Sequence, residues 1–150
     1  MKAISLWQPW ASLWACGRKT YETRSWATNY RGPILVHAAK RIETDISDAL
    51  REICEEEFGG HWTVNLPAGA LIAVCDRVLC HTTDGAIAAF LDEEEKAQGN
   101  FGPGRFAWEA FNMRELPAPI PWRGMQQLFE VPDHLVTGAE PPSPAQGKLL

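Results

Sequence analysis

The sequence predicts one mostly antiparallel α+β domain that curls into a small β-barrel, with about five or six strands and two or three covering helices. Short apolar runs separated by glycine and proline turns indicate the strands, and no regular strand-helix alternation is present that would favour a parallel sheet. At 150 residues with 45% hydrophobic content, the chain can bury one core without disulfide or metal support. We therefore expect a single domain over residues 1–136.

The first half of the chain predicts two helices and two strands. A proline and a glycine at the expected ends indicate a short helix over residues 10–16, and the alternation that follows predicts a strand over residues 20–26. The apolar run 34–39 predicts a central strand. Thr44 or Asp45 is expected to cap a second helix with one apolar stripe. That stripe consists of Ile46, Ala49, Leu50, Ile53 and Cys54.

The second half predicts further strands around one helix. Residues 70–80 are rich in aliphatic side chains and predict a long buried strand, interrupted by an Asp-Arg pair. Residues 86–98 predict a helix whose acidic cluster, residues 92–95, is most simply a solvated face. Two more strands, separated by a proline-rich connection, are expected over residues 105–111 and 125–131.

Composition limits the compartment and the cofactors. No signal-peptide pattern follows Met1, and no apolar run approaches the roughly 18 residues of a membrane span, so we expect a cytoplasmic protein with no membrane partner. The four cysteines have no paired spacing, which argues against a structural zinc site and favours reduced, mostly buried thiols. No cofactor is expected. Residues 137–150 are rich in proline and poor in apolar residues, and we expect a disordered tail.

The segment 17–26 is the part of the chain most suited to touch a ligand. In an alternating strand Glu22, Arg24 and Trp26 share one face, where a carboxylate, a guanidinium and an indole can hydrogen-bond and stack on a flat polar ring. Lys19, just past the first helix, can meet an anion. The alternative is a weak ion pair between Glu22 and Arg24 on a solvated surface.

Charge distribution supports a binding role. Residues 1–41 contain seven basic residues and one acid, a net charge of +6, whereas the remaining residues carry −11 and the whole chain −5. A net-acidic protein with a locally basic, aromatic segment fits focused recognition of an anionic ligand, and non-specific coating of duplex DNA is not expected.

Several motifs together resemble the ASCH domain, a branch of the PUA-like fold. They are QPWASL at residues 8–13, a G-x-K-x-x-E-x-R pattern at residues 17–24, the Ser25-Trp26 and Tyr30-Arg31-Gly32 segments, and the stretches 67–80 and 120–131. The resemblance covers most of residues 3–133 and is closest to the form found in a eukaryotic transcription coactivator. It implies a β-barrel whose cleft binds RNA or another nucleic acid.

The resemblance also implies enzymes within the family. Some small members resemble amidohydrolases that act on acylated cytidine through a motif lysine, a threonine and a glutamate, and others are linked to RNA cleavage. The motif lysine is Lys19 here, but Glu22 stands where the cytidine hydrolases have threonine. A lysine beside a carboxylate stays protonated unless burial lowers its pKa, so Lys19 suits anion binding better than nucleophilic attack.

The leading hypothesis is a module that binds single-stranded RNA or DNA, or a modified nucleoside, as a monomer by preference. Its expected contacts are Pro9, Trp10, Lys19, Glu22, Arg24, Ser25, Trp26, Arg31 and Arg105. Trp10 or Trp26 would stack on a base, Glu22 and Ser25 would read its polar edge, and the basic residues would hold phosphates. The runner-up is a hydrolase of a modified nucleoside or RNA, with Glu22 as acid or base and Lys19 stabilising negative charge. His37, in an apolar run, is expected to be structural rather than a base.

Overall fold

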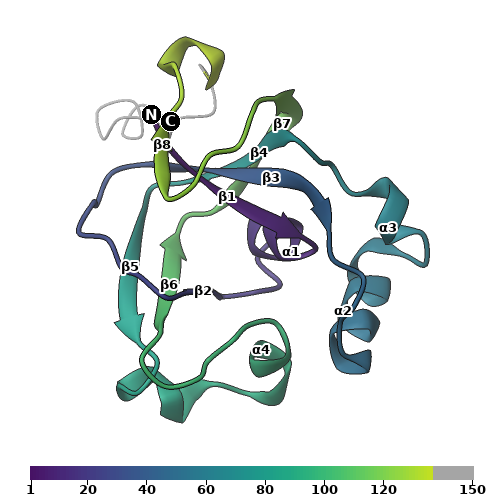
Figure 1. Cartoon of the computed structure of the whole chain (residues 1–150), viewed down its shortest axis with the longest axis vertical. Coiled ribbons are helices and arrows are strands. Elements are labelled where there is room, and N and C mark those ends of the chain that lie inside the picture. The colour runs from purple at the N-terminus through teal and green to yellow at the C-terminus, as the bar shows by residue number, and fades with distance from the viewer. Residues whose placement is uncertain (137–150) are drawn as a thin grey trace, which may run out of the picture.

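The computed structural model describes residues 1–136 and places eight strands in two sheets (Figure 1). The larger sheet has the order β7-β4-β3-β1-β8 and the smaller one the order β2-β6-β5. These pairings establish an α+β fold; they do not themselves close a barrel. The predicted tail, residues 137–150, lies outside the described residues.

The first half of the chain largely follows the prediction. The structure has β1 (Lys2–Gln8), α1 (Trp10–Ala15), β2 (Tyr21–Arg24), β3 (Ile34–Ile42) and α2 (Asp48–Phe58). Strand β1 was not predicted, and it pairs with β3 in parallel, so the larger sheet is mixed rather than antiparallel. Ser47, and neither Thr44 nor Asp45, caps α2 by accepting a hydrogen bond from the Leu50 amide at 3.1 Å.

The predicted long strand over residues 70–80 is wrong, because the chain changes sheet at Asp76. Strand β4 (Ala70–Cys75) belongs to the larger sheet and β5 (Arg77–Thr82) to the smaller one. The chain returns to the larger sheet beside this corner, between β6 (Phe106–Phe111) and β7 (Arg114–Pro121). The Asp76 carboxylate accepts hydrogen bonds from Asn112 at 3.1 Å and Arg114 at 2.9 Å, so one aspartate ties both crossings together.

Two other expectations in the second half need correction. Residues 86–98 form a 3₁₀ helix (Ala86–Phe90) and the short helix α4 (Glu93–Ala97) instead of one helix. The proline-rich connection is itself strand β7, which lies at the edge of its sheet, where proline is tolerated. The remaining elements are α3 (Trp62–Asn65), β8 (Leu128–Glu130) and a 3₁₀ helix over Asp133–Val136.

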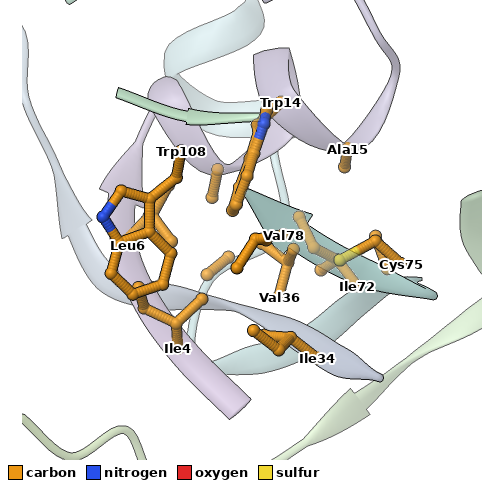
Figure 2. Close-up of a cluster of buried hydrophobic side chains, with 13 residues drawn as sticks. Ile4, Leu6, Trp14, Ala15, Ile34, Val36, Ile72, Cys75, Val78 and Trp108 are labelled. Atoms are coloured by element: carbon orange, nitrogen blue, oxygen red, sulfur yellow. The ribbon is translucent and has the colours of Figure 1, made fainter. Parts of the chain in front are cut away.

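The main core lies between the sheets and against α1. Figure 2 shows Trp14 and Trp108 around a group of aliphatic side chains that includes Leu6, Val36 and Val78. A separate cluster packs α2 and α3, seen together at the right of Figure 1, against Leu13. Among residues 1–136, no helix has the length and apolar character needed to cross a membrane.

Trp108 connects this core to the segment 17–26. It is fully buried on β6, pairs in register with Glu22, and donates a hydrogen bond to the Trp26 carbonyl at 3.0 Å. The Trp26 ring packs edge-on against it, with centroids 4.8 Å apart. Trp26 therefore lies just beyond β2, half buried against the core, and not on a free strand face.

Trp108→Ala is expected to lower the free energy of unfolding by about 3–5 kcal/mol, since it leaves a cavity and an unpaired carbonyl. Urea denaturation measures the change. Phe90→Ala is the matched control, because Phe90 is 81% exposed and its loss should change stability by less than about 0.5 kcal/mol. Equal effects of the two substitutions would contradict the role given to Trp108.

Candidate nucleic-acid interface

Two cavities share Ser5, Trp7 and Arg24 in their walls and are therefore adjacent. The larger has a volume of about 1040 Å³ and the smaller about 560 Å³. Both fall near the size range of ligand sites in proteins. Arg24, from the predicted motif, lies at their junction.

A buried ion pair fixes the motif. The Lys19 ammonium is fully buried and pairs with Oε1 of Glu22, whose side chain is 10% exposed. Burial lowers the pKa of Lys19, and the Glu22 carboxylate offsets part of this shift. Glu22 Oε2 lies 3.2 Å from Arg24 Nε, outside hydrogen-bond geometry, so this second contact is an ion pair only. Arg24 Nη2 donates to the Ser5 carbonyl at 2.7 Å, which ties β2 to β1.

A second buried carboxylate holds the start of β2. Glu95 of α4 accepts hydrogen bonds from the backbone amides of Thr20 at 2.8 Å and Tyr21 at 3.3 Å. Asp92 caps α4 by accepting from the Glu95 amide at 2.8 Å. The expectation that residues 92–95 form a solvated face is thus wrong for Glu95, which is buried. Helix α4 positions Lys19 and Glu22 through these backbone contacts.

The larger cavity is cationic and aromatic. Its charged side chains are Arg24, Lys40 and Arg123, and no acidic residue lines it. Three indoles contribute to its walls, those of Trp7, Trp26 and Trp122. Within the described residues, neither Lys40 nor Arg123 has an ion-pair or hydrogen-bond partner, so both can meet an anion.

The floor of the larger cavity is a hydrogen-bonded trio. His37 Nε2 lies 2.7 Å from the Trp122 carbonyl, which only accepts, so this nitrogen carries a proton. Burial lowers the pKa of His37, against the smaller effect of that carbonyl, so the ring is neutral at pH 7. Its Nδ1 then accepts a hydrogen bond from the Ser5 hydroxyl at 2.9 Å. The Ser5 hydroxyl is thus a donor in this contact, and Ser5 lines both cavities.

Gly124 allows the 122–127 segment to approach this trio. A Cβ at this position would lie 2.8 Å from both His37 Cε1 and Ser5 Oγ, closer than real contacts allow. Glycine is therefore required by space rather than by a left-handed backbone. The close approach places Trp122 and Arg123 in the cavity wall.

The smaller cavity has a balanced charge. Trp10 contributes an aromatic wall, Glu22 and Asp45 provide carboxylates, and Arg24 and Arg105 provide guanidinium groups. Arg105 is partly engaged, since its Nε donates to the Asn100 carbonyl at 3.0 Å. This arrangement suits the polar edge of a ring better than a free phosphate.

The structure brings together five of the nine predicted contact residues. Arg24 and Trp26 line the larger cavity, and Arg24 lines the smaller one with Trp10, Glu22 and Arg105. The other four, Pro9, Lys19, Ser25 and Arg31, line neither cavity. Pro9 and Lys19 are buried, and Ser25 and Arg31 are exposed. Burial of Lys19 does not fit the expectation that it meets a phosphate directly; it holds Glu22 instead.

Sequence reasoning missed Trp7, Lys40, Trp122 and Arg123 as site residues. Trp7 is 48% exposed, and the Arg41 guanidinium lies 4.0 Å from its ring centroid, a cation–π contact that orients the indole. Trp7 and Lys40 lie on β1 and β3, and the other two follow β7. The large number of tryptophans and the basic N-terminal segment indicate a binding surface, but they do not predict which of these side chains face a cavity.

The described portion of the chain contains no clustered metal ligands and no disulfide. Residues 1–136 contain no group of three or more His, Cys, Asp or Glu side chains placed to hold a metal ion. All four cysteines are free thiols, with Cys54 and Cys75 buried and Cys16 and Cys80 half buried. Burial raises the pKa of Cys54 and Cys75 to about 11, which keeps them protonated at neutral pH.

Comparison with known proteins identifies the family. The ASCH domain family model matches residues 4–120, and the chain belongs to that family, a PUA-like module. It is 24% identical over 154 residues to activating signal cointegrator 1 of Mus musculus and of Homo sapiens, covering 98% of this chain but 25% of those proteins. The chain thus spans about a quarter of the length of the curated relatives it matches.

The fold is similar to solved ASCH structures. An ASCH protein from Zymomonas mobilis has a TM-score of 0.53 to this chain at 15% identity, with 91% of this chain and 90% of that chain covered. A mutant of the same protein gives the same TM-score and identity, with 92% of that chain covered. At this identity the likeness establishes the fold alone.

The buried Lys19–Glu22 pair gives a test of stability. Lys19→Met is expected to lower the free energy of unfolding by about 3–5 kcal/mol because Glu22 loses its buried partner, whereas the double variant Lys19→Met with Glu22→Met should recover much of that loss. Urea denaturation of the wild type, the two single variants and the double variant measures both changes in stability. Lys96→Met is the matched control, since Lys96 forms an exposed i,i+3 pair with Glu93 and should change stability by less than about 0.5 kcal/mol. A Lys19→Met effect no larger than the control would show that the pair is solvated in solution.

Proposed function

We propose that this ASCH domain is a nucleic-acid-binding module that holds single-stranded RNA or DNA in its larger cavity. The observation that carries the proposal is the lining of that cavity, which combines three cationic side chains and three indoles with no acidic residue. Cations hold a phosphate backbone and aromatic rings stack on bases, and single-stranded binding sites use both.

Phosphate binding rests on two cations without an acidic partner among the described residues, Lys40 and Arg123, and on Arg24, which is held in place. Lys40 and Arg123 have no acidic neighbour in the cavity wall, and Arg24 is fixed by its contacts with Glu22 and Ser5. Several acidic side chains lie away from this cavity. Glu56 and Glu57 on α2 and Glu94 on α4, for example, pair with Arg18. This separation supports an anionic ligand at the cavity in a protein that is acidic overall.

Base stacking rests on the partly exposed indoles. Trp7 lies at the junction of the two cavities with 48% of its surface exposed, and Arg41 over its ring limits its rotation. Trp26 is held edge-on by Trp108 and presents the rest of its ring to the larger cavity. A fixed aromatic ring loses little conformational freedom on binding, which favours stacking.

The alternative, a hydrolase that uses Lys19 and Glu22, has weaker support. The lowered pKa of Lys19 meets one requirement for a nucleophile. Its ammonium is nevertheless fully buried against Glu22 and lines neither cavity, so no substrate reaches it without rearrangement. Of these two residues, only Glu22 faces a cavity. Acid–base catalysis there would need a second titrating group, and the other carboxylate of that cavity is Asp45.

The proposal predicts a modest salt dependence. If Arg24, Lys40 and Arg123 each neutralise one phosphate, log K for a single-stranded oligonucleotide should fall with log salt concentration with a slope of about −2, or about −0.7 per contact. Lys40→Ala and Arg123→Ala should each make the slope shallower by about 0.7. Fluorescence anisotropy across a salt series measures these slopes.

Arg31→Ala and Arg77→Ala serve as controls for this experiment. Arg31 is exposed outside both cavities, and Arg77 lies over the Phe111 ring on β6. Both changes should leave the slope as in the wild type. A shallower slope for Arg31→Ala, with no effect of Lys40→Ala, would place the phosphate path outside the larger cavity.

Trp7→Ala should weaken oligonucleotide binding by about 1–3 kcal/mol through lost stacking and leave the salt slope unchanged. Phe90→Ala, which removes another exposed aromatic ring away from the cavities, should leave affinity unchanged. Thermal melts of both variants show that the protein is folded at the assay temperature. Wild-type affinity of a folded Trp7→Ala protein would exclude Trp7 as a stacking platform.

A further inference from the structure

The smaller cavity differs in charge from the larger one, although the two are adjacent. Two carboxylates, from Glu22 and Asp45, face the two guanidinium groups of Arg24 and Arg105. A phosphate gains little from such a balanced site, whereas a polar ring with both donors and acceptors can pair with it. Its volume of about 560 Å³ is that of a site for a small molecule.

The walls that the two cavities share connect them into one path. Ser5, Trp7 and Arg24 line both. A strand whose backbone follows Arg24, Lys40 and Arg123 therefore has a neighbouring base within reach of the smaller cavity. Trp10 in the wall of that cavity offers a ring against which a base can pack.

Glu22 is an unusual acceptor within this wall. Its side chain is nine-tenths buried, and Lys19 fixes it through Oε1. Among residues 1–136, Oε2 accepts no hydrogen bond, because Arg24 Nε approaches it at 3.2 Å without hydrogen-bond geometry. A carboxylate oxygen has room for two hydrogen bonds, so Glu22 retains acceptor capacity on both oxygens.

We propose that the smaller cavity is a base-selective subsite of the same single strand, and that Glu22 selects guanine there. The inference rests on the proposed nucleic-acid binding. Guanine presents N1–H and the N2 amino group side by side, two donors that match an acceptor-only carboxylate. Uracil flanks its single N–H with two carbonyl oxygens, and adenine and cytosine place a ring acceptor beside their amino group, so each sets a lone pair against the carboxylate.

Arg105 completes the match from another side of the cavity. Its Nε and Nη2 donate to the backbone carbonyls of Asn100 and Thr23, while Nη1 has no partner within the described residues. Guanidinium groups pair with O6 and N7 of guanine. The contact of Arg105 Nη2 with the Thr23 carbonyl holds this side chain against β2, and Arg105 lines the smaller cavity together with Glu22 and Arg24.

The test uses the full chain and labelled single-stranded hexamers of uridine in which one central position is guanine, inosine, adenine or uracil. Anisotropy at fixed salt is expected to give the guanine hexamer about tenfold tighter binding than the adenine or uracil hexamer, with inosine, which lacks the N2 amino group, in between. Deoxy versions of the four hexamers separate a preference for RNA from one for DNA. Glu22→Gln should abolish the guanine preference. Glu109→Gln, which changes a carboxylate that lines neither cavity, should retain it.

Each outcome decides the inference. Where Glu22→Gln alone fails to fold, the double variant Lys19→Met with Glu22→Gln removes the pair without leaving a buried charge, and should bind all hexamers alike. Equal wild-type affinity for the four hexamers, with the predicted salt slope intact, overturns guanine selection and leaves the binding proposal standing. A guanine preference that survives Glu22→Gln overturns the role of Glu22, and its loss in Asp45→Asn would assign the selection to Asp45 instead. Absence of binding to every hexamer overturns both proposals.

Discussion

The buried ion pair between Lys19 and Glu22 is the interaction on which the rest of the site depends. Lys19 is anchored directly after α1, where its amide donates to the Leu13 carbonyl at 3.0 Å, and its ammonium fixes Glu22 on β2. Glu22 then orients Arg24, and Arg24 bonds to Ser5 on β1. A charged pair costs more desolvation than an apolar pair of similar volume, so stability does not explain it. Its consequence is a carboxylate held in the wall of the smaller cavity and a guanidinium held at the junction of the two cavities.

The same constraint explains why one motif serves two different surfaces. Arg24 and the neighbouring Trp7 belong to both cavities, yet Lys40 and Arg123 make one of them cationic, while Glu22 and Asp45 balance the charge of the other. A single strand presents this same alternation, because its backbone is uniformly anionic and its bases carry neutral polar edges. The two surfaces together therefore fit a chain of nucleotides better than they fit a single small anion.

The local sequence predicts those helices and strands whose ends and faces are marked by nearby residues. Helix α1, strand β3 and the motif strand β2 follow from a proline, a glycine and alternating side chains. Strand β7 was read as a connection because of Pro117, Pro119 and Pro121, but it lies at a sheet edge and retains the N–H groups of the residues between them. The break at Asp76 was visible in the sequence, whereas its consequence, a change of sheet, depends on Asn112 and Arg114 much further along the chain.

The site was predictable only where its residues are close in sequence. Glu22, Arg24 and Trp26 were found because they fall within five positions, while Trp7, Lys40 and Arg123 reach the cavity from three other parts of the chain. Lys19 shows a different limit of sequence-based prediction. The motif identified this residue but did not predict that its side chain is buried. Burial depends on Glu95, which holds the adjacent backbone from 75 residues away. A basic residue in a binding motif can thus serve the ligand indirectly, by fixing the carboxylate that faces the cavity, and its charge alone does not identify it as a phosphate contact.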